Sequence, residues 1–192
     1  MKTLLILLLT LTLNLYGSNH EDELRFQSTG INKISNTYFM TLTSKTGDYE
    51  IWICCNHSMG DVYSANGIIV KKDQMSTFIQ RLTLARNKYI EWVNVASKGD
   101  AKDYYLKLNN TSSNYKLDMH LNAAFDCFYG SSTQSQTKIK KEQIIKYNFL
   151  IFDNCYFLLL ESDNLIGMDY INLYFNSVEE IDGFIKVISN IK

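Results

Sequence analysis

The sequence predicts an α+β fold: a mostly antiparallel sheet with two amphipathic helices packed on it. Three observations indicate this class. Apolar residues recur at three- and four-residue steps over about 73–97 and 178–191, which is the period of one helical face. Other short segments alternate apolar and polar residues, which is the period of a strand. Turn-forming residues separate several of these segments, as expected for antiparallel hairpins.

Nine segments carry the strand pattern. They are 38–43, 49–55, 68–70, 104–108, 115–121, 123–129, 145–152, 155–160 and 169–175. Asp153 and Asn154 alone separate two apolar runs, so they predict a two-residue hairpin. The run 156–160 is apolar on both faces, which predicts a central strand covered by a helix on one side.

Both helices carry signals at their ends. Asp73 is placed to cap the first helix, and Gly99 follows its last turn. Leu84 alone falls on the side opposite to the apolar stripe. Ser177, with Glu180 three residues later, is a capping box, which predicts the start of the second helix.

The N-terminus has the order of a secretory signal. Lys2 precedes an apolar run, and small residues follow at Gly17 and Ser18. The run is shorter than the roughly 20 residues that span a bilayer, so we expect no membrane span once the signal is removed. An uncleaved anchor is the alternative, because Leu15 is larger than usual for its place before the cut. The sequence predicts a secreted or periplasmic chain, cleaved near Gly17.

The remaining chain is expected to form one domain. Residues 18–35 are polar and aperiodic and predict a flexible N-terminal segment, followed by a single α+β domain over 36–192. The hydrophobic fraction of 46% with 20% charged residues predicts a packed core. The net charge of −1 gives no concentrated basic face, which argues against nucleic acid as a partner.

Four cysteines raise the question of disulfides. They are Cys54, Cys55, Cys127 and Cys155, and an oxidising compartment would permit two bonds among them. Cys54 and Cys55 are adjacent on a strand, so their side chains point to opposite faces and a bond between them would need unusual geometry. Disulfides and buried free thiols both stay open at this point.

A speculative catalytic or metal cluster consists of Cys54, Cys55, His57, His120 and Asp126, because thiolate, imidazole and carboxylate serve as metal ligands and catalytic groups. The paired C-x-x-C spacing of structural zinc is absent, so we predict no metal and no cofactor. His120 falls on the polar face of its strand. Asp126 interrupts an apolar strand; we expect it on the solvent face, and burial would require a raised pKa or a dedicated partner.

Aromatic residues make up 13% of the chain, and Trp52 is the best candidate for a surface contact because it shares a strand face with Glu50. No common catalytic motif is present. The sequence therefore favours a non-catalytic exported binding or interaction protein with a protein or glycan ligand. A small hydrolase or thiol-dependent enzyme is one alternative, and a structural, oligomerising envelope component is the other.

Overall fold

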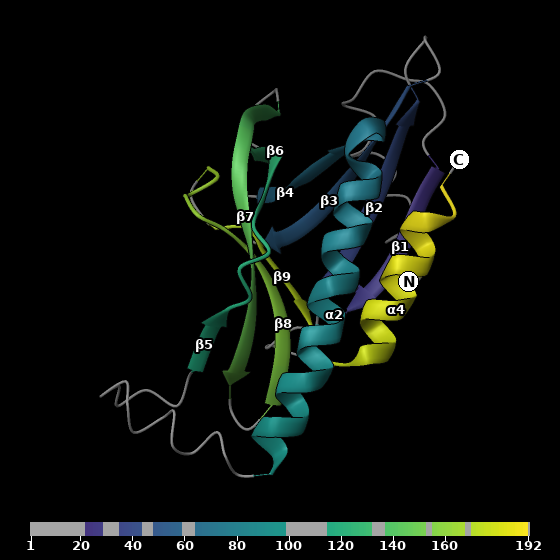
Figure 1. Cartoon of the computed structure of the whole chain (residues 1–192). Coiled ribbons are helices and arrows are strands. Elements are labelled where there is room, and N and C mark those ends of the chain that lie inside the picture. The colour runs from purple at the N-terminus through teal and green to yellow at the C-terminus, as the bar shows by residue number, and fades with distance from the viewer. Residues whose placement is uncertain are drawn as a thin grey trace, which may run out of the picture.

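The computed structural model describes residues 22–28, 35–43, 48–58, 64–98, 115–131, 137–152, 155–167 and 170–191. This part of the chain forms one sheet and two α-helices (Figure 1). The strands are β1 (Asp22–Ser28), β2 (Ser35–Thr43), β3 (Tyr49–Ser58), β4 (Ser64–Lys71), β5 (Tyr115–Asp118), β6 (Ala123–Ser131), β7 (Lys138–Phe152), β8 (Cys155–Ser162) and β9 (Asn172–Phe175). A 3₁₀ turn, η1 (Lys72–Gln74), precedes α2 (Met75–Ser97), and α4 (Val178–Ser189) follows β9.

The sheet is antiparallel throughout and strongly curled. Its order is β1-β2-β3-β4-β6-β7-β8-β9. The 15-residue β7 is long enough to pair with β6 along its first part and with β5 along its last part. The α+β class is confirmed, although the sheet dominates the structure.

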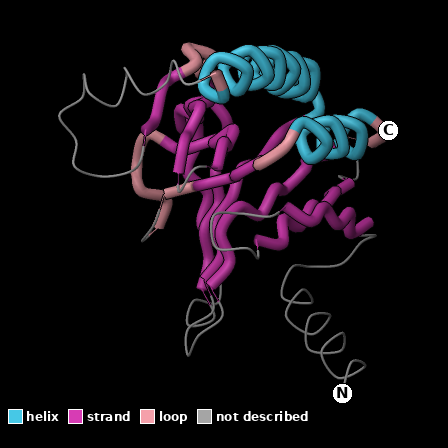
Figure 2. Tube along the Cα trace, turned by 90° about the horizontal axis from the view of Figure 1, so that it is seen from below, coloured by secondary structure: helices cyan, strands magenta, loops and turns pink. Residues whose placement is uncertain are grey.

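Both helices lie against the same face of the sheet, which we call the inner face (Figure 2). Phe78 of α2 meets Phe125 of β6 edge-on at 5.2 Å between ring centroids, and Phe184 of α4 meets Phe175 of β9 at 5.0 Å. These side chains are fully buried, and each such burial stabilises the fold by about 1.5–3 kcal/mol. The other side of the sheet is the outer face.

The helix ends follow the sequence only in part. Asp73 does not cap α2: it lies inside the 3₁₀ turn, and the backbone N–H of Lys71 donates to Oε1 of Gln74 there. Leu84 is exposed, as predicted. Ser177 caps α4, because its Oγ accepts from the N–H of Glu180 at 3.2 Å. Gly99 lies outside the described residues.

The strand predictions are confirmed best for β7 and β8 and for the turn between them. Phe152 pairs with Cys155, which confirms the two-residue hairpin, and residues 157–160 are buried, which confirms β8 as a covered strand. The expectation of a loose segment over 18–35 missed β1, in which Leu24 and Phe26 alternate with polar residues. The expected strand 104–108 lies outside the described residues.

No helix within the described ranges combines the length and apolar character needed to cross a membrane. The predicted signal segment, residues 1–17, also lies outside those ranges.

Candidate functional site

The four cysteines are free thiols in the structure, and none forms a disulfide. Cys55 and Cys127 are buried on the inner face, within the core. Burial raises the pKa of Cys54 and of Cys127 to about 12, and raises that of Cys55 as well. These three side chains therefore stay protonated, whereas a thiol nucleophile must be a thiolate. Cys155 is exposed at the start of β8.

The rest of the speculative cluster is dispersed. Asp126 lies on the outer face of β6, opposite to Cys55 and Cys127, and His120 is 85% exposed beyond the end of β5. Asp126 contacts residue 142 of β7, and Asp118, at the end of β5, pairs with residue 148 of β7. These two positions on β7 are six residues apart, which is about 20 Å of extended strand. A base must approach its proton to about 3 Å, so His120 and Asp126 do not act together. The His57 side chain lies outside the described part.

His120 follows β5 rather than belonging to it, which corrects the predicted strand 115–121. Oδ1 of Asp118 accepts from the backbone N–H of His120 at 2.7 Å, and His120 adopts a positive φ of 56°. A carboxylate that bonds the backbone two residues ahead competes with strand pairing, so β5 ends at Asp118.

Asp126 is buried, contrary to expectation, and has dedicated partners. Its Oδ2 pairs with Nζ of Lys71 at 2.8 Å, and its Oδ1 accepts from the N–H of Glu142 at 3.0 Å. Opposite Asp126, β7 carries an extra residue, and Glu142 has a positive φ of 52°. Burial raises the pKa of the Asp126 carboxyl, but Lys71 and the Glu142 amide outweigh it, so the pKa is lowered. Asp126 therefore holds a β-bulge.

Trp52 is a second correction: it is 9% exposed and does not offer a surface contact. Its ring lies 4.8 Å from that of Phe128, and both pack with Ile69 on the outer face. Its Nε1 donates to Oε2 of Glu50 at 3.2 Å. The alternation correctly placed Trp52 on the same strand face as Glu50. It did not reveal that Ile69 and Phe128, on neighbouring strands, bury the indole.

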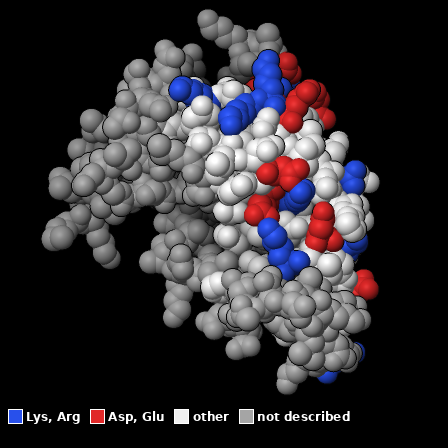
Figure 3. Space-filling model, turned by 90° about the vertical axis from the view of Figure 1, so that its left-hand side faces the viewer, with Lys and Arg blue, Asp and Glu red and all other residues white. Residues whose placement is uncertain are grey.

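A polar hollow of about 370 Å³ lies on the outer face, where β5, β7 and β8 meet. Its side chains come from these three strands and from the segment that follows β8. The lining residues are Lys116, Asp118, Lys146, Asn148, Glu161, Ser162, Asp163 and Tyr170. Figure 3 views the molecule from this side and shows acidic and basic side chains interleaved.

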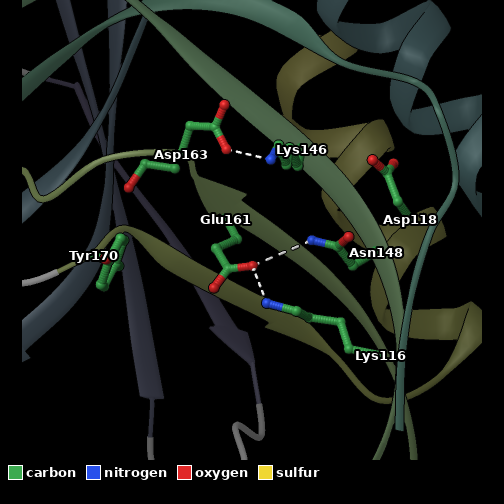
Figure 4. A pocket seen from close by; sticks show the side chains of 8 residues that line it. Lys116, Asp118, Lys146, Asn148, Glu161, Asp163 and Tyr170 are labelled. Atoms are coloured by element: carbon green, nitrogen blue, oxygen red, sulfur yellow. Dashed lines mark hydrogen bonds and ion pairs between the residues drawn. The ribbon is translucent and has the colours of Figure 1, made fainter. Parts of the chain in front are cut away.

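Two ion pairs cross the hollow (Figure 4). Nζ of Lys116 lies 2.7 Å from Oε2 of Glu161, which also accepts from Nδ2 of Asn148 at 3.4 Å. Lys146 pairs with Asp163. The hydrogen bond that Lys146 donates to Asp163 raises the pKa of Lys146, and the charges of Asp118 and Glu161 raise it further. Lys146 therefore stays an ammonium at neutral pH, which makes it a donor and not a base.

The segment that carries Asp163 and Tyr170 is held from three sides. The Asp163 N–H donates to the carbonyl of Ile144 at 3.0 Å. Nδ2 of Asn66, on β4, donates to the carbonyl oxygens of Ile166 and Tyr170 at 3.4 and 3.5 Å. Nearby, the Ile171 N–H donates to Oγ of Ser162 at 2.9 Å, and Nζ of Lys140 donates to the carbonyl of Leu165. Residues 163–166 and 170–171, at the border of the hollow, are therefore hydrogen-bonded to β4, β7 and β8.

No family model, curated protein or solved structure matches this chain. The chemistry of the hollow must be derived from its own side chains. Within the described ranges, no group of three or more His, Cys, Asp and Glu side chains is arranged to hold a metal ion.

Sequence reasoning missed the residues of the hollow, although one pair was within reach. The two-residue hairpin fixes the register of β7 on β8, and counting back from Phe152 and Cys155 places Lys146 opposite Glu161. Lys116 gave no such signal, because the strand residues that pair between β5 and β7 are at least 30 positions apart in the chain. Among the predicted site residues whose side chains the structure describes, only His120 contacts a residue of the hollow, because its backbone N–H donates to Asp118.

Proposed function

We propose that this chain is a non-catalytic binding domain whose ligand occupies the outer-face hollow. One observation carries the proposal: a hollow of about 370 Å³ gathers charged and amide side chains from three strands and from the residues that follow β8. Clefts that bind small molecules have volumes of about 300–1,000 Å³, and this hollow has such a volume with a mostly polar lining.

The state of the charged groups favours binding over catalysis. Each lysine of the hollow is engaged with a carboxylate, Lys116 with Glu161 and Lys146 with Asp163. General acid–base catalysis needs a group with a pKa near the working pH, and the raised pKa of Lys146 moves that group away from it. Paired side chains are also held in one orientation, which lowers the entropic cost of binding.

The predicted export signal supports a location for the protein: we propose that the mature domain lies outside the cytoplasm. Expression of the full chain in a secreting host, followed by intact-mass measurement, tests this. A mature product that begins near Ser18 is expected, and a product that retains residues 1–17 in the cytosol would contradict it.

A ligand screen tests the binding role. Isotope-labelled protein is exposed to a set of amino acids, dipeptides, carboxylic acids and mono- and disaccharides while its amide NMR signals are recorded. We expect at least one compound to shift the side-chain amide of Asn148, to lose affinity in Glu161→Gln, and to keep it in Glu91→Gln. Glu91 is the matched control because it is exposed on α2, away from the hollow. A hit that the protein converts chemically, or that ignores Glu161→Gln, would overturn the proposal.

A further inference from the structure

The charges in the hollow already compensate one another. Its lining contains two lysines and three carboxylates, so its formal charge is 2 − 3 = −1. An ionic ligand would exchange one exposed ion pair for another, and exposed pairs are worth only about 0–1 kcal/mol. Ligand charge therefore contributes little affinity here, and the polar lining gives an apolar ligand no burial.

The hydrogen-bonding pattern of the lining matches hydroxyl groups. An ammonium has three N–H donors, and a carboxylate accepts at two oxygens. Lys116 and Asn148 both bond Oε2 of Glu161, which leaves Oε1 of Glu161 without a partner among the described residues. Donors and acceptors thus alternate over a short distance (Figure 4). A hydroxyl both donates and accepts, so neighbouring hydroxyls on one ring can satisfy such a pattern without displacing an ion pair.

Tyr170 borders the hollow, and the residue is 41% exposed. An aromatic side chain combines an apolar face with a polar hydroxyl, so it can cover the C–H face of a sugar ring. The carbonyl oxygen of Tyr170 accepts a hydrogen bond from Nδ2 of Asn66 at 3.5 Å. Gly167, in the same connecting segment, packs on Tyr129 with a positive φ of 79°, and a Cβ there would lie 2.8 Å from that ring.

We infer that the hollow binds a neutral saccharide: hydroxyls on adjacent carbons bond Glu161, Asn148 and the lysine ammonium groups, and Tyr170 covers the ring face. This inference rests on the proposed binding role and names its ligand class. It depends on interleaved donors and acceptors beside one exposed aromatic ring, and not on net charge.

Titration with neutral disaccharides tests it. The probes are maltose, cellobiose, lactose and N,N′-diacetylchitobiose, each added to isotope-labelled full chain and followed by NMR. At least one should shift the Asn148 side-chain amide and the Tyr170 backbone amide in a saturable way. Added sodium chloride should change the affinity less than twofold, because a neutral ligand forms no ion pair.

Two pairs of variants separate a direct role from misfolding. Tyr170→Ala should weaken binding by about tenfold, whereas Tyr170→Phe keeps the ring and most of the affinity. Glu161→Gln should also weaken it by about tenfold, since hydrogen bonds to charged groups are stronger than those to neutral groups. The matched control, Glu91→Gln, should bind as the unaltered chain does. Amide spectra of each variant report whether its fold is retained.

The remaining outcomes are decisive. If only dipeptides or carboxylic acids shift the hollow, the saccharide inference is wrong and the binding role stands. If no probe shifts the hollow, both are wrong. Equal affinities of Tyr170→Ala and Tyr170→Phe for a bound disaccharide would show that the aromatic ring of Tyr170 does not contact the sugar.

Discussion

Two groups of lysines and carboxylates lie on the same outer face of the sheet, and they differ in what surrounds them. Around Asp126, one lysine and one backbone amide hold a carboxylate whose side chain is 9% exposed. In the hollow, Lys116 and Glu161 make a pair of similar length, but Glu161 is 22% exposed and Lys116 is 49% exposed. The types of side chain and the length of the ion pair therefore do not distinguish the two groups.

The difference in burial assigns them different roles. A buried carboxylate that loses its partners leaves polar groups without hydrogen bonds, which costs about 1–3 kcal/mol. An exposed pair can be lost to water with little effect on folding. The closed group therefore serves the fold by fixing the bulge at Glu142, and the open group is available to a ligand. Three changes test this contrast.

The largest effect is expected at Gly67, on β4 between β3 and β6. A Cβ at this position would lie 1.9 Å from the carbonyl oxygen of Ile53 and 2.6 Å from the ring of Phe128. Gly67→Ala must push β3, β4 and β6 apart, so we expect a loss of about 3 kcal/mol or more in the free energy of unfolding. Urea unfolding measures it, with Lys116→Ala in the hollow as control. A loss below about 1 kcal/mol would show that the strands relax freely.

An intermediate effect is expected at Asp126. Asp126→Ala removes the acceptor for the Glu142 amide and should cost about 1–3 kcal/mol at neutral pH. Asp126→Asn keeps an acceptor there and should cost less. Both are measured by urea unfolding.

The pH dependence sharpens the same test. The folded pKa of Asp126 lies below its ordinary value, so its contribution is full above that value and is lost as the pH falls toward the folded pKa. Unfolding from neutral pH down to about pH 3 should therefore show a shallower acid loss in both variants than in the unaltered chain. Parallel curves would mean that the ion pair adds nothing to stability.

The smallest effect is expected in the hollow. In a double-mutant cycle of Lys116→Ala and Glu161→Gln, we expect a coupling energy below about 1 kcal/mol. Each single variant should unfold almost as the unaltered chain does, even where ligand binding is lost. A coupling above about 2 kcal/mol would make this pair as structural as the one at Asp126.

How far the sequence predicts the fold depends on the range of the interaction. Helix α4 followed from a capping box within four residues, and the β7–β8 hairpin from a two-residue turn. The cap of α2 was wrong because Gln74 bonds the backbone of Lys71 and closes a 3₁₀ turn first. The prediction that His120 lies in the strand was wrong because its backbone N–H donates to Asp118, and β5 ends at Asp118.

The burial of single residues was less predictable. Alternation correctly placed Trp52 on the face of Glu50, and Asp126 on the face opposite to Cys127. It could not tell that Trp52 is buried among Ile69 and Phe128 on the outer face, whereas Lys116 and Glu161 line a hollow on that same face. Burial depends on which strands become neighbours and how the sheet curls, and neither is encoded in a local period.

The sequence by itself determined the α+β class, the two helices, most strands and the register that sets Lys146 opposite Glu161, because these follow from periodicity and short turns. Only the tertiary structure decided that Lys116 joins them from β5, and that Asn66 holds Tyr170 from 104 residues away. It also decided that one lysine–carboxylate group is closed and the other open. Contacts of this range leave no pattern along the chain, since the pairing of distant strands creates them.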